Sequence, residues 1–132
     1  MHHELCFGCG QTNLFGLLMD ADRAENGRLS GRWFVKQDHQ GPERGMAHPG
    51  IVASALIEAA MLAGGDGVRL EHIELELGSG PAPAVGSFCE VEASTSDETV
   101  DVVASADGHR VGTLRAVIAA GEANTQGGKL NG

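Results

Sequence analysis

One carboxylate stands alone in the longest apolar run of the sequence. Glu58 is the only ionisable residue among the fifteen from Pro49 to Ala63. Burying an isolated charge is costly unless a partner or a proton neutralises it. Glu58 is therefore either the structural partner of another group or an acid/base that takes part in chemistry. Ser54 precedes it by one helical turn on the same side, where it could orient Glu58 or a water molecule.

Two cysteines form the second suggestive spacing. Cys6 and Cys9, within Cys6-Phe7-Gly8-Cys9-Gly10, have the Cys-x-x-Cys spacing of a zinc knuckle. A structural zinc ion needs about four ligands, and only Cys89 and scattered histidines remain. We therefore expect no metal and no cofactor, with reduced thiols packing a loop. His2 and His3 could be left from a purification tag, and we assign them no role.

Charge and length narrow the classes of function. The chain has 132 residues and a net charge of −9, which disfavours long-range attraction to nucleic acid or an anionic membrane. An anionic ligand would need a local basic patch, which Arg32, Lys36 and Arg44 could supply. The odd number of cysteines, the lack of a signal-peptide pattern and the lack of a run of ~20 apolar residues predict a cytoplasmic protein.

Hydrophobic periodicity predicts one helix among strands. The helix spans about residues 50–63, with Pro49 in its first turn and Gly64-Gly65 ending it. A bulge is expected near Glu71-His72, because the parity of apolar residues changes there. The predicted strands are residues 17–23, 28–36, 68–77, 87–94, 100–106 and 110–119.

The helix is apolar nearly all round, so something broad must cover it. An antiparallel sheet of five to six strands wrapped around one central helix, an α+β fold, satisfies this requirement. We expect a single domain over residues 1–120, with an irregular N-terminal segment at residues 1–16. Residues 121–132 are polar and Gly-rich, and we predict a flexible tail there.

Cys6-Phe7-Gly8-Cys9-Gly10 is followed by Asn13, Gly16 and Leu17, and His39-Gln40-Gly41 stands ahead of the predicted helix. In this order the motifs resemble one branch of the hotdog-fold acyl-CoA thioesterases, which opens with Cys-x-x-Cys-Gly-x-x-Asn-Pro-x-Gly-Leu and has His-Gln-Gly ahead of its helix. His48-Pro49-Gly50 matches a His-Gly-Gly signature, and residues 51–59 match Ile-x-Ala-Thr-Leu-Leu-Asp-Glu-Ala. The motif match covers residues 6–61, and the remainder matches in strand order.

The resemblance implies a homodimer or a dimer of dimers that hydrolyses an acyl-CoA or similar thioester at the subunit interface. It assigns the backbone N–H of Gly50 to the thioester carbonyl and a helix carboxylate to the role of nucleophile or water activator. A helix N-terminus suits the first role, because it offers unpaired donors and a positive dipole end to a developing oxyanion.

The chain departs from that pattern where the carboxylate should be. Ile57 occupies the position of the family's catalytic Asp, and Glu58 aligns with the Glu that follows it. At 100° per residue, Gly50 and Ile57 lie within ~20° of one helix face, whereas Glu58 lies ~80° away from Gly50. Two smaller departures are Leu14 in place of Pro and Pro49 in place of the first Gly.

Two hypotheses follow. The first is a thioester hydrolase with catalytic residues Glu58, Gly50, Gln40 and Ser54, and with His48, His39, Ile57 and Arg44 at the substrate. The second is a non-catalytic hotdog dimer that binds an acyl or aromatic small molecule, the family's Asp having been lost. Structural alternatives remain open for the site residues: Glu58 as a buried ion-pair partner, His48 as a loop brace and Gln40 as an exposed loop amide.

Overall fold

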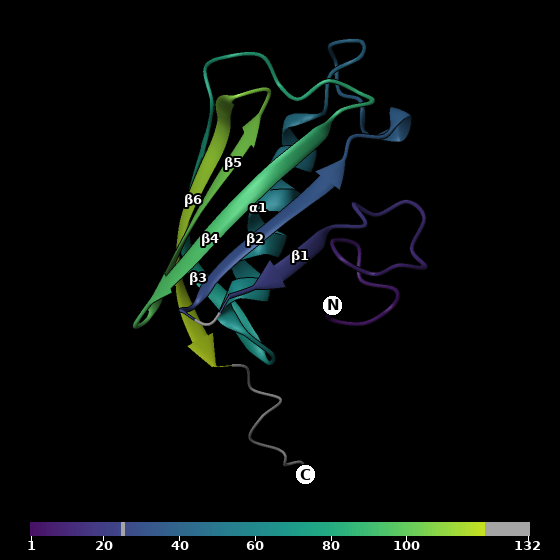
Figure 1. Ribbon diagram of the computed structural model, residues 1–132. Coiled ribbons are helices and arrows are strands. Elements are labelled where there is room, and N and C mark those ends of the chain that lie inside the picture. Colours follow the sequence, from purple (N-terminus) through teal and green to yellow (C-terminus); the bar gives the residue numbers. More distant parts are fainter. Residues whose placement is uncertain (25, 121–132) are drawn as a thin grey trace.

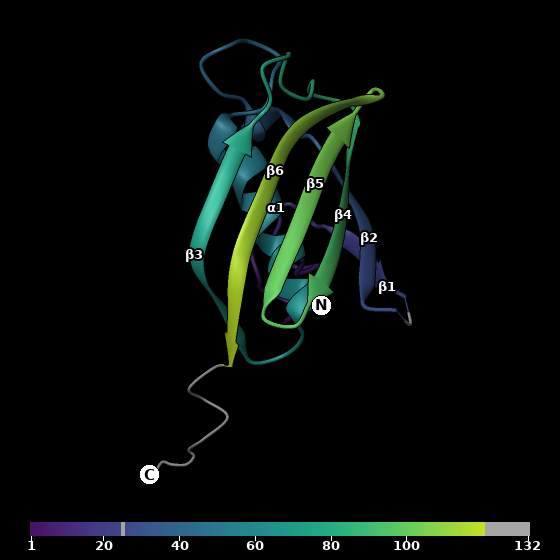
Figure 2. The same ribbon diagram turned by 90° about the vertical axis from the view of Figure 1, so that its left-hand side faces the viewer.

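The computed structural model describes residues 1–24 and 26–120; Glu25 and the predicted tail at residues 121–132 lie outside the described residues. One six-stranded antiparallel sheet forms the body, in the order β1-β2-β4-β5-β6-β3 (Figure 2). Its elements are β1 (Asp20–Arg23), β2 (Arg28–Phe34), a short 3-10 helix η1 (Gln37–His39), α1 (Pro49–Gly64), β3 (Val68–Leu77), β4 (Phe88–Ser96), β5 (Thr99–Ala106) and β6 (His109–Ala120).

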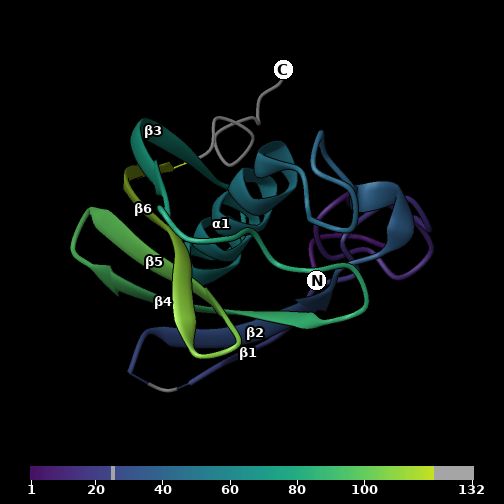
Figure 3. The same ribbon diagram turned by 90° about the horizontal axis from the view of Figure 1, so that it is seen from above.

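The sheet curls around α1, as the sequence predicts (Figures 1 and 3). Pro49 opens the helix, and the His48 side chain caps it by accepting a hydrogen bond from the Gly50 N–H. The helix ends at Gly64, and Gly65 follows it with a positive φ of +98°, a backbone conformation that favours glycine. Small side chains let the strands approach closely, and the buried helix positions are Val52, Ala55, Leu56, Glu58, Ala59, Ala60 and Ala63.

Strand alternation builds the other half of the core. In β5 every second residue is buried, from Val100 to Ala106, and in β2 Leu29 and Trp33 point inward. These are the apolar positions that a period of two assigns to one face of a strand. Among the described residues, the buried apolar side chains therefore form one hydrophobic cluster between α1 and the sheet.

The strand β3 forms one edge of the sheet and carries the predicted bulge. Its register against β6 shifts between Glu71 and Glu74, and His72 has a φ of +52°. From the bulge onward, Ile73, Leu75 and Leu77 are exposed on this edge strand. An exposed apolar edge is a surface on which another strand can pair.

The prediction of a strand starting at residue 17 is wrong, because β1 begins only at Asp20. Residues 17–19 bond instead to the N-terminal segment, residues 1–16. Leu17 N–H donates to the Phe7 carbonyl at 2.7 Å, and Met19 N–H donates to the Gly8 carbonyl at 2.8 Å. Leu17 and Met19 are both buried, so this segment is fastened to the side of the sheet where β1 lies (Figure 1).

His39, predicted to contact the substrate, is buried at the end of η1. Its Nδ1 accepts a hydrogen bond from the Lys36 N–H at 3.1 Å, and its ring meets Trp33 edge-on with 6.0 Å between centroids. Burial lowers the pKa of His39 below its ordinary value, the charge of Lys36 adds to this, and Asp38 opposes it. The neutral imidazole is therefore the form that this loop holds.

Among the described residues, no helix has both the length and the apolar character needed to cross a membrane. The cytoplasmic location stays a prediction.

We predict that His39 makes the fold sensitive to acid. Because its pKa is lowered on folding, the unfolded chain takes up the proton first, so His39 opposes folding increasingly as the pH falls below about 6.5. The free energy of unfolding, measured by urea denaturation between pH 8 and pH 5, should fall less steeply in His39→Asn, whose side-chain oxygen can still accept from Lys36. Identical slopes in the two proteins would contradict this assignment.

Candidate functional site

The Gly50 amide, predicted to hold a carbonyl, already has an acceptor within the chain. Its N–H donates to His48 Nδ1 at 2.8 Å, and the His48 N–H donates in turn to the His39 carbonyl at 2.8 Å. Gly50 and His48 are both exposed. The arrangement is a helix cap that fixes the loop before α1, which is the bracing role that the sequence leaves open for His48.

The residues predicted to assist at that end bond mainly to the backbone. Gln40 Nε2 donates to the Gln37 carbonyl at 2.9 Å, and Gln40 Oε1 accepts from the Gly45 N–H at 2.7 Å. Ser54 Oγ donates to the Gly50 carbonyl at 2.8 Å. Arg44 is exposed in the same loop. The loop and the first turn of α1 are thus held by their own polar side chains.

Ile57, at the position of the family's Asp, is half-buried and packs against the core cluster. Of the predicted basic patch, Arg32 lies over the Phe88 ring at 4.4 Å, and Lys36 Nζ donates to the Leu14 carbonyl. The three cations therefore have different surroundings, and Arg44 is the one that belongs to the loop before α1.

Glu58 faces the N-terminal segment. The residue is 7% exposed, and its Oε2 lies 2.9 Å from His2 Nδ1. The Cys6 thiol is 3.8 Å from both carboxylate oxygens. Eight residues of helix separate Glu58 from Gly50, a rise of about 12 Å. Within one chain the predicted base and the predicted oxyanion donor are therefore not brought together.

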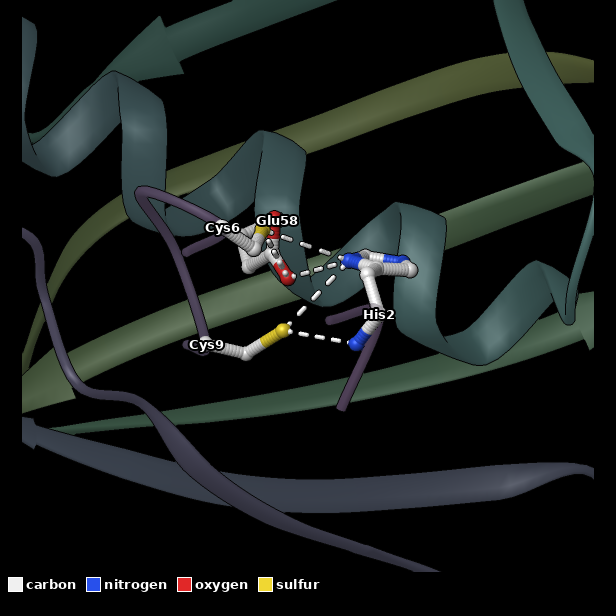
Figure 4. Close-up of side chains that lie close together, drawn as sticks. All are labelled: His2, Cys6, Cys9 and Glu58. Atoms are coloured by element: carbon white, nitrogen blue, oxygen red, sulfur yellow. Dashed lines mark hydrogen bonds and ion pairs between the residues drawn. The ribbon is translucent and has the colours of Figure 1, made fainter. Parts of the chain in front are cut away.

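Four potential metal-ligating side chains gather at this point (Figure 4). We call His2, Cys6, Cys9 and Glu58 the N-terminal cluster. Their ligand atoms all lie within 4.8 Å of one another. His2 Nδ1 is 3.5 Å from the Cys6 sulfur and 3.4 Å from the Cys9 sulfur. The first three residues come from the N-terminal segment and the fourth from the middle of α1.

Backbone and side-chain hydrogen bonds give the N-terminal segment its shape without a helix or strand. The Gly10 N–H donates to the Cys6 carbonyl at 2.9 Å, which closes a tight loop around the two cysteines. Thr12 donates to the Glu4 carbonyl through both its N–H, at 3.0 Å, and its Oγ1, at 2.8 Å. Asn13 Nδ2 donates to the Leu5 carbonyl at 3.1 Å. The loop therefore presents both sulfurs toward α1.

Gly8 makes the approach of Glu58 sterically feasible. A Cβ built at Gly8 would lie 2.3 Å from both Cγ and Cδ of Glu58. A non-bonded carbon pair does not come that close. Because Gly8 has no side chain, the carboxylate of Glu58 can pack against the loop between Cys6 and Cys9.

Sequence reasoning missed His2 and the partners of Glu58. The expectation of no metal rested on a shortage of ligands, and that premise is wrong, because His2 and Glu58 join the two cysteines. The sequence signal for these partners is the His-x-x-x-Cys-x-x-Cys spacing of His2, Cys6 and Cys9. Burial raises the pKa of the Cys9 thiol to about 12; the His2 amide lowers this pKa and Glu58 raises it further.

Five surface hollows of the described chain, with volumes from 230 to 530 Å³, are lined by other residues than Gly50 and Glu58. One of about 330 Å³ lies beside the N-terminal cluster, where Cys9 and Met1 form part of its wall. The carboxylate of Glu58 does not line any of the five.

Comparison of structures identifies the fold. A phenylacetic acid degradation-related protein from Ralstonia eutropha JMP134 is 18% identical, with a TM-score of 0.65 over 77% of this chain and 84% of that one. The phenylacetic acid degradation protein PaaI from Thermus thermophilus is 19% identical, with a TM-score of 0.65 over 76% and 90%. A thioesterase superfamily protein is 16% identical, with a TM-score of 0.68 over 83% and 60%. The chain thus has the hotdog fold that its sequence predicts.

The comparisons of sequence found no match. No protein-family model matches the chain, and no curated protein matches it. At identities this low the structural likeness establishes the fold alone, and the chemistry depends on the side chains.

We predict that Gly8→Ala destabilises the protein by about 1–3 kcal/mol, the usual range for overpacking. The added methyl group would displace the Glu58 side chain and open the N-terminal cluster. Gly80→Ala is the matched control, because a Cβ there would meet its nearest atom at 3.6 Å. Chemical denaturation followed by Trp33 fluorescence measures both changes. Equal stabilities for the two variants would refute the steric argument.

Proposed function

We propose that this protein is a thioesterase-like hotdog dimer that binds an acyl thioester near the start of α1 without using Glu58 to hydrolyse it. The observation that carries this proposal is the position of Glu58. Its carboxylate is buried against His2 and Cys6, more than two helical turns from the Gly50 amide. A base in that position cannot activate a water molecule for attack on a carbonyl held by Gly50 of the same chain.

The composition of α1 supports binding without turnover. Glu58 is the only carboxylate in the helix. Ile57 lies on the side of the helix that also bears Gly50, within ~20°, and an alkyl side chain can neither accept a proton nor attack a carbonyl. An apolar residue at that position instead suits contact with an acyl chain.

Two copies of the chain are part of the proposal. The edge strand β3 exposes Ile73, Leu75 and Leu77, and it pairs with β6 on one side only among the described strands. Pairing of β3 with a second copy would cover this edge and satisfy its free backbone groups. The family that the motifs resemble assembles in pairs, with its ligand sites at the subunit interface.

The ligand class follows from the fold and the charge of the loop. Two structural neighbours are named for phenylacetic acid degradation, so aromatic acyl thioesters belong among the candidates beside short and long aliphatic ones. Arg44 is exposed in the loop before α1, where it could meet an anionic group such as a phosphate of coenzyme A.

The second candidate function is hydrolysis. It is favoured by the exposed N-terminal end of α1 at Gly50, whose positive dipole end suits an oxyanion. It requires the Gly50 N–H to exchange its acceptor, His48 Nδ1, for the carbonyl of the ligand. Glu58 would be the base, with Ser54 and Gln40 assisting. This candidate requires the carboxylate to leave the N-terminal cluster, so the two candidates make opposite predictions for Glu58→Gln.

We predict that the wild-type protein binds at least one of acetyl-, palmitoyl- and phenylacetyl-CoA in calorimetry yet releases no thiol above background. Glu58→Gln should behave in the same way in a thiol-release assay, because Glu58 is not the base. Thiol release by the wild type that drops 10²–10⁴-fold in Glu58→Gln, the loss typical of a missing general base, would support hydrolysis instead.

A control separates a chemical role of Glu58 from a structural one. Cys9→Ser perturbs the N-terminal cluster and leaves the carboxylate in place. If thiol release were lost in Glu58→Gln and kept in Cys9→Ser, Glu58 would be catalytic and the binding proposal would fail.

We predict that Ile57→Asp gains thiol release, because it places a carboxylate on the side of α1 that bears Gly50. An increase of roughly 10²–10⁴-fold over Ile57→Asn is the expected size of a general-base contribution. Ile57→Asn is nearly the same size and cannot act as the base, so it controls for the polar substitution. Equal rates for the two variants would show that the missing Asp does not explain the lack of turnover.

A further inference from the structure

The geometry points to a zinc site formed by His2, Cys6, Cys9 and Glu58. Tetrahedral zinc holds sulfur at about 2.3 Å and nitrogen or oxygen at about 2.0–2.2 Å, which sets the ligand atoms about 3.3–3.8 Å apart. In the N-terminal cluster His2 Nδ1 lies 3.5 and 3.4 Å from the two sulfurs, and Cys6 lies 3.8 Å from the Glu58 oxygens. The separation of His2 from Glu58 is shorter, 2.9 Å.

The convergence of these contacts on one nitrogen argues for a shared cation. His2 Nδ1 faces Glu58, Cys6 and Cys9 at the same time. A ring nitrogen carries one proton at most, so hydrogen bonding can link it to the three groups only incompletely. One metal ion at their common centre would interact with all four ligands at once.

The same convergence excludes a nucleophilic cysteine relay in this arrangement. A Cys–His–Glu relay needs the thiol on one ring nitrogen and the carboxylate on the other, so that the imidazole can pass a proton between them. Here the sulfur of Cys6 and the carboxylate of Glu58 both lie against Nδ1 of His2. The four side chains therefore surround one common position and do not form a proton relay.

Burial and charge favour occupancy by a cation. Glu58 is 7% exposed and Cys9 is 2% exposed. Two sulfurs packed against a carboxylate would repel one another once ionised, and a divalent cation removes that repulsion while taking the thiols as thiolates. The His2 N–H donates to the Cys9 sulfur at 3.1 Å, which is the kind of outer hydrogen bond that supports a metal-bound sulfur.

The ligand set selects zinc and a structural role. Two thiolates, an imidazole and a carboxylate in tetrahedral array suit zinc, because hard cations such as Mg²⁺ prefer oxygen ligands in octahedral array. Four protein ligands complete the coordination, so the ion would have no open position for a water or substrate. It would fasten the N-terminal segment to the middle of α1. This role is independent of the ligand bound near Gly50.

The experiment uses the full chain without any added histidine tag, purified under reducing conditions. Elemental analysis should find about one zinc ion per chain. After removal of the metal with a chelator and titration with Co²⁺, sulfur-to-cobalt charge-transfer bands and the visible bands of tetrahedral cobalt should grow to one equivalent. Zn²⁺ should then displace Co²⁺, and Mg²⁺ should not.

Matched variants test two of the four proposed ligands. His2→Ala and Cys9→Ser should each bind Co²⁺ at least tenfold more weakly than the wild type. His3→Ala and Cys89→Ser should keep the wild-type affinity, since neither residue belongs to the N-terminal cluster. Circular dichroism checks that each variant is folded.

Some results would overturn the zinc site. One is a wild-type protein that is fully reduced, holds no zinc and gives no cobalt bands. Another is equal metal content in the His2 and His3 variants. If a ligand variant does not fold, the wild type alone decides the question: chelation should lower its Tm and Zn²⁺ should restore it, and a Tm unaffected by chelation would refute the site. None of these readouts depends on thioester binding, so the two proposals can fail separately.

Discussion

The burial of one carboxylate in an apolar helix constrains much of this protein. α1 can fill the curved sheet because its buried face is made of small and aliphatic side chains, yet Glu58 interrupts that face. An acid in such surroundings is tolerated only with polar partners. The partners come from the N-terminal segment, which lacks a helix or strand and contributes His2 and Cys6 to the carboxylate. Helix and segment therefore depend on each other.

The contact between Glu58 and the N-terminal segment makes the middle of α1 different from its start. Its first residues, Pro49 and Gly50, are exposed, and the side chains of His48 and Ser54 bond to the backbone of Gly50. Its middle is covered by the loop around Gly8. A ligand approaching the first turn would not meet Glu58 of the same chain. The hotdog fold is shared with proteins named as thioesterases, but a fold hosts different functions, and the side chains decide among them.

Local patterns predicted most of the architecture correctly because their physical causes are local. The helix from about residue 50 to 63 follows from apolar composition between Pro49 and Gly65. The bulge near His72 follows from a change in alternation, and the structure has it there. The strand expected from residue 17 failed for a non-local reason. Leu17 and Met19 have strand-like side chains, but their N–H groups bond to residues 7 and 8.

By itself, the sequence determined the succession of strands along the chain, the central helix and the isolation of Glu58, since periodicity and composition act over a few residues. The tertiary structure decided what Glu58 meets. Cys6 and Glu58 are 52 positions apart, and their contact depends on how the N-terminal segment is tied to the sheet edge and on which side of α1 remains to be covered. Spacing along the chain does not encode such a meeting, because it arises only when two separately formed surfaces pack together.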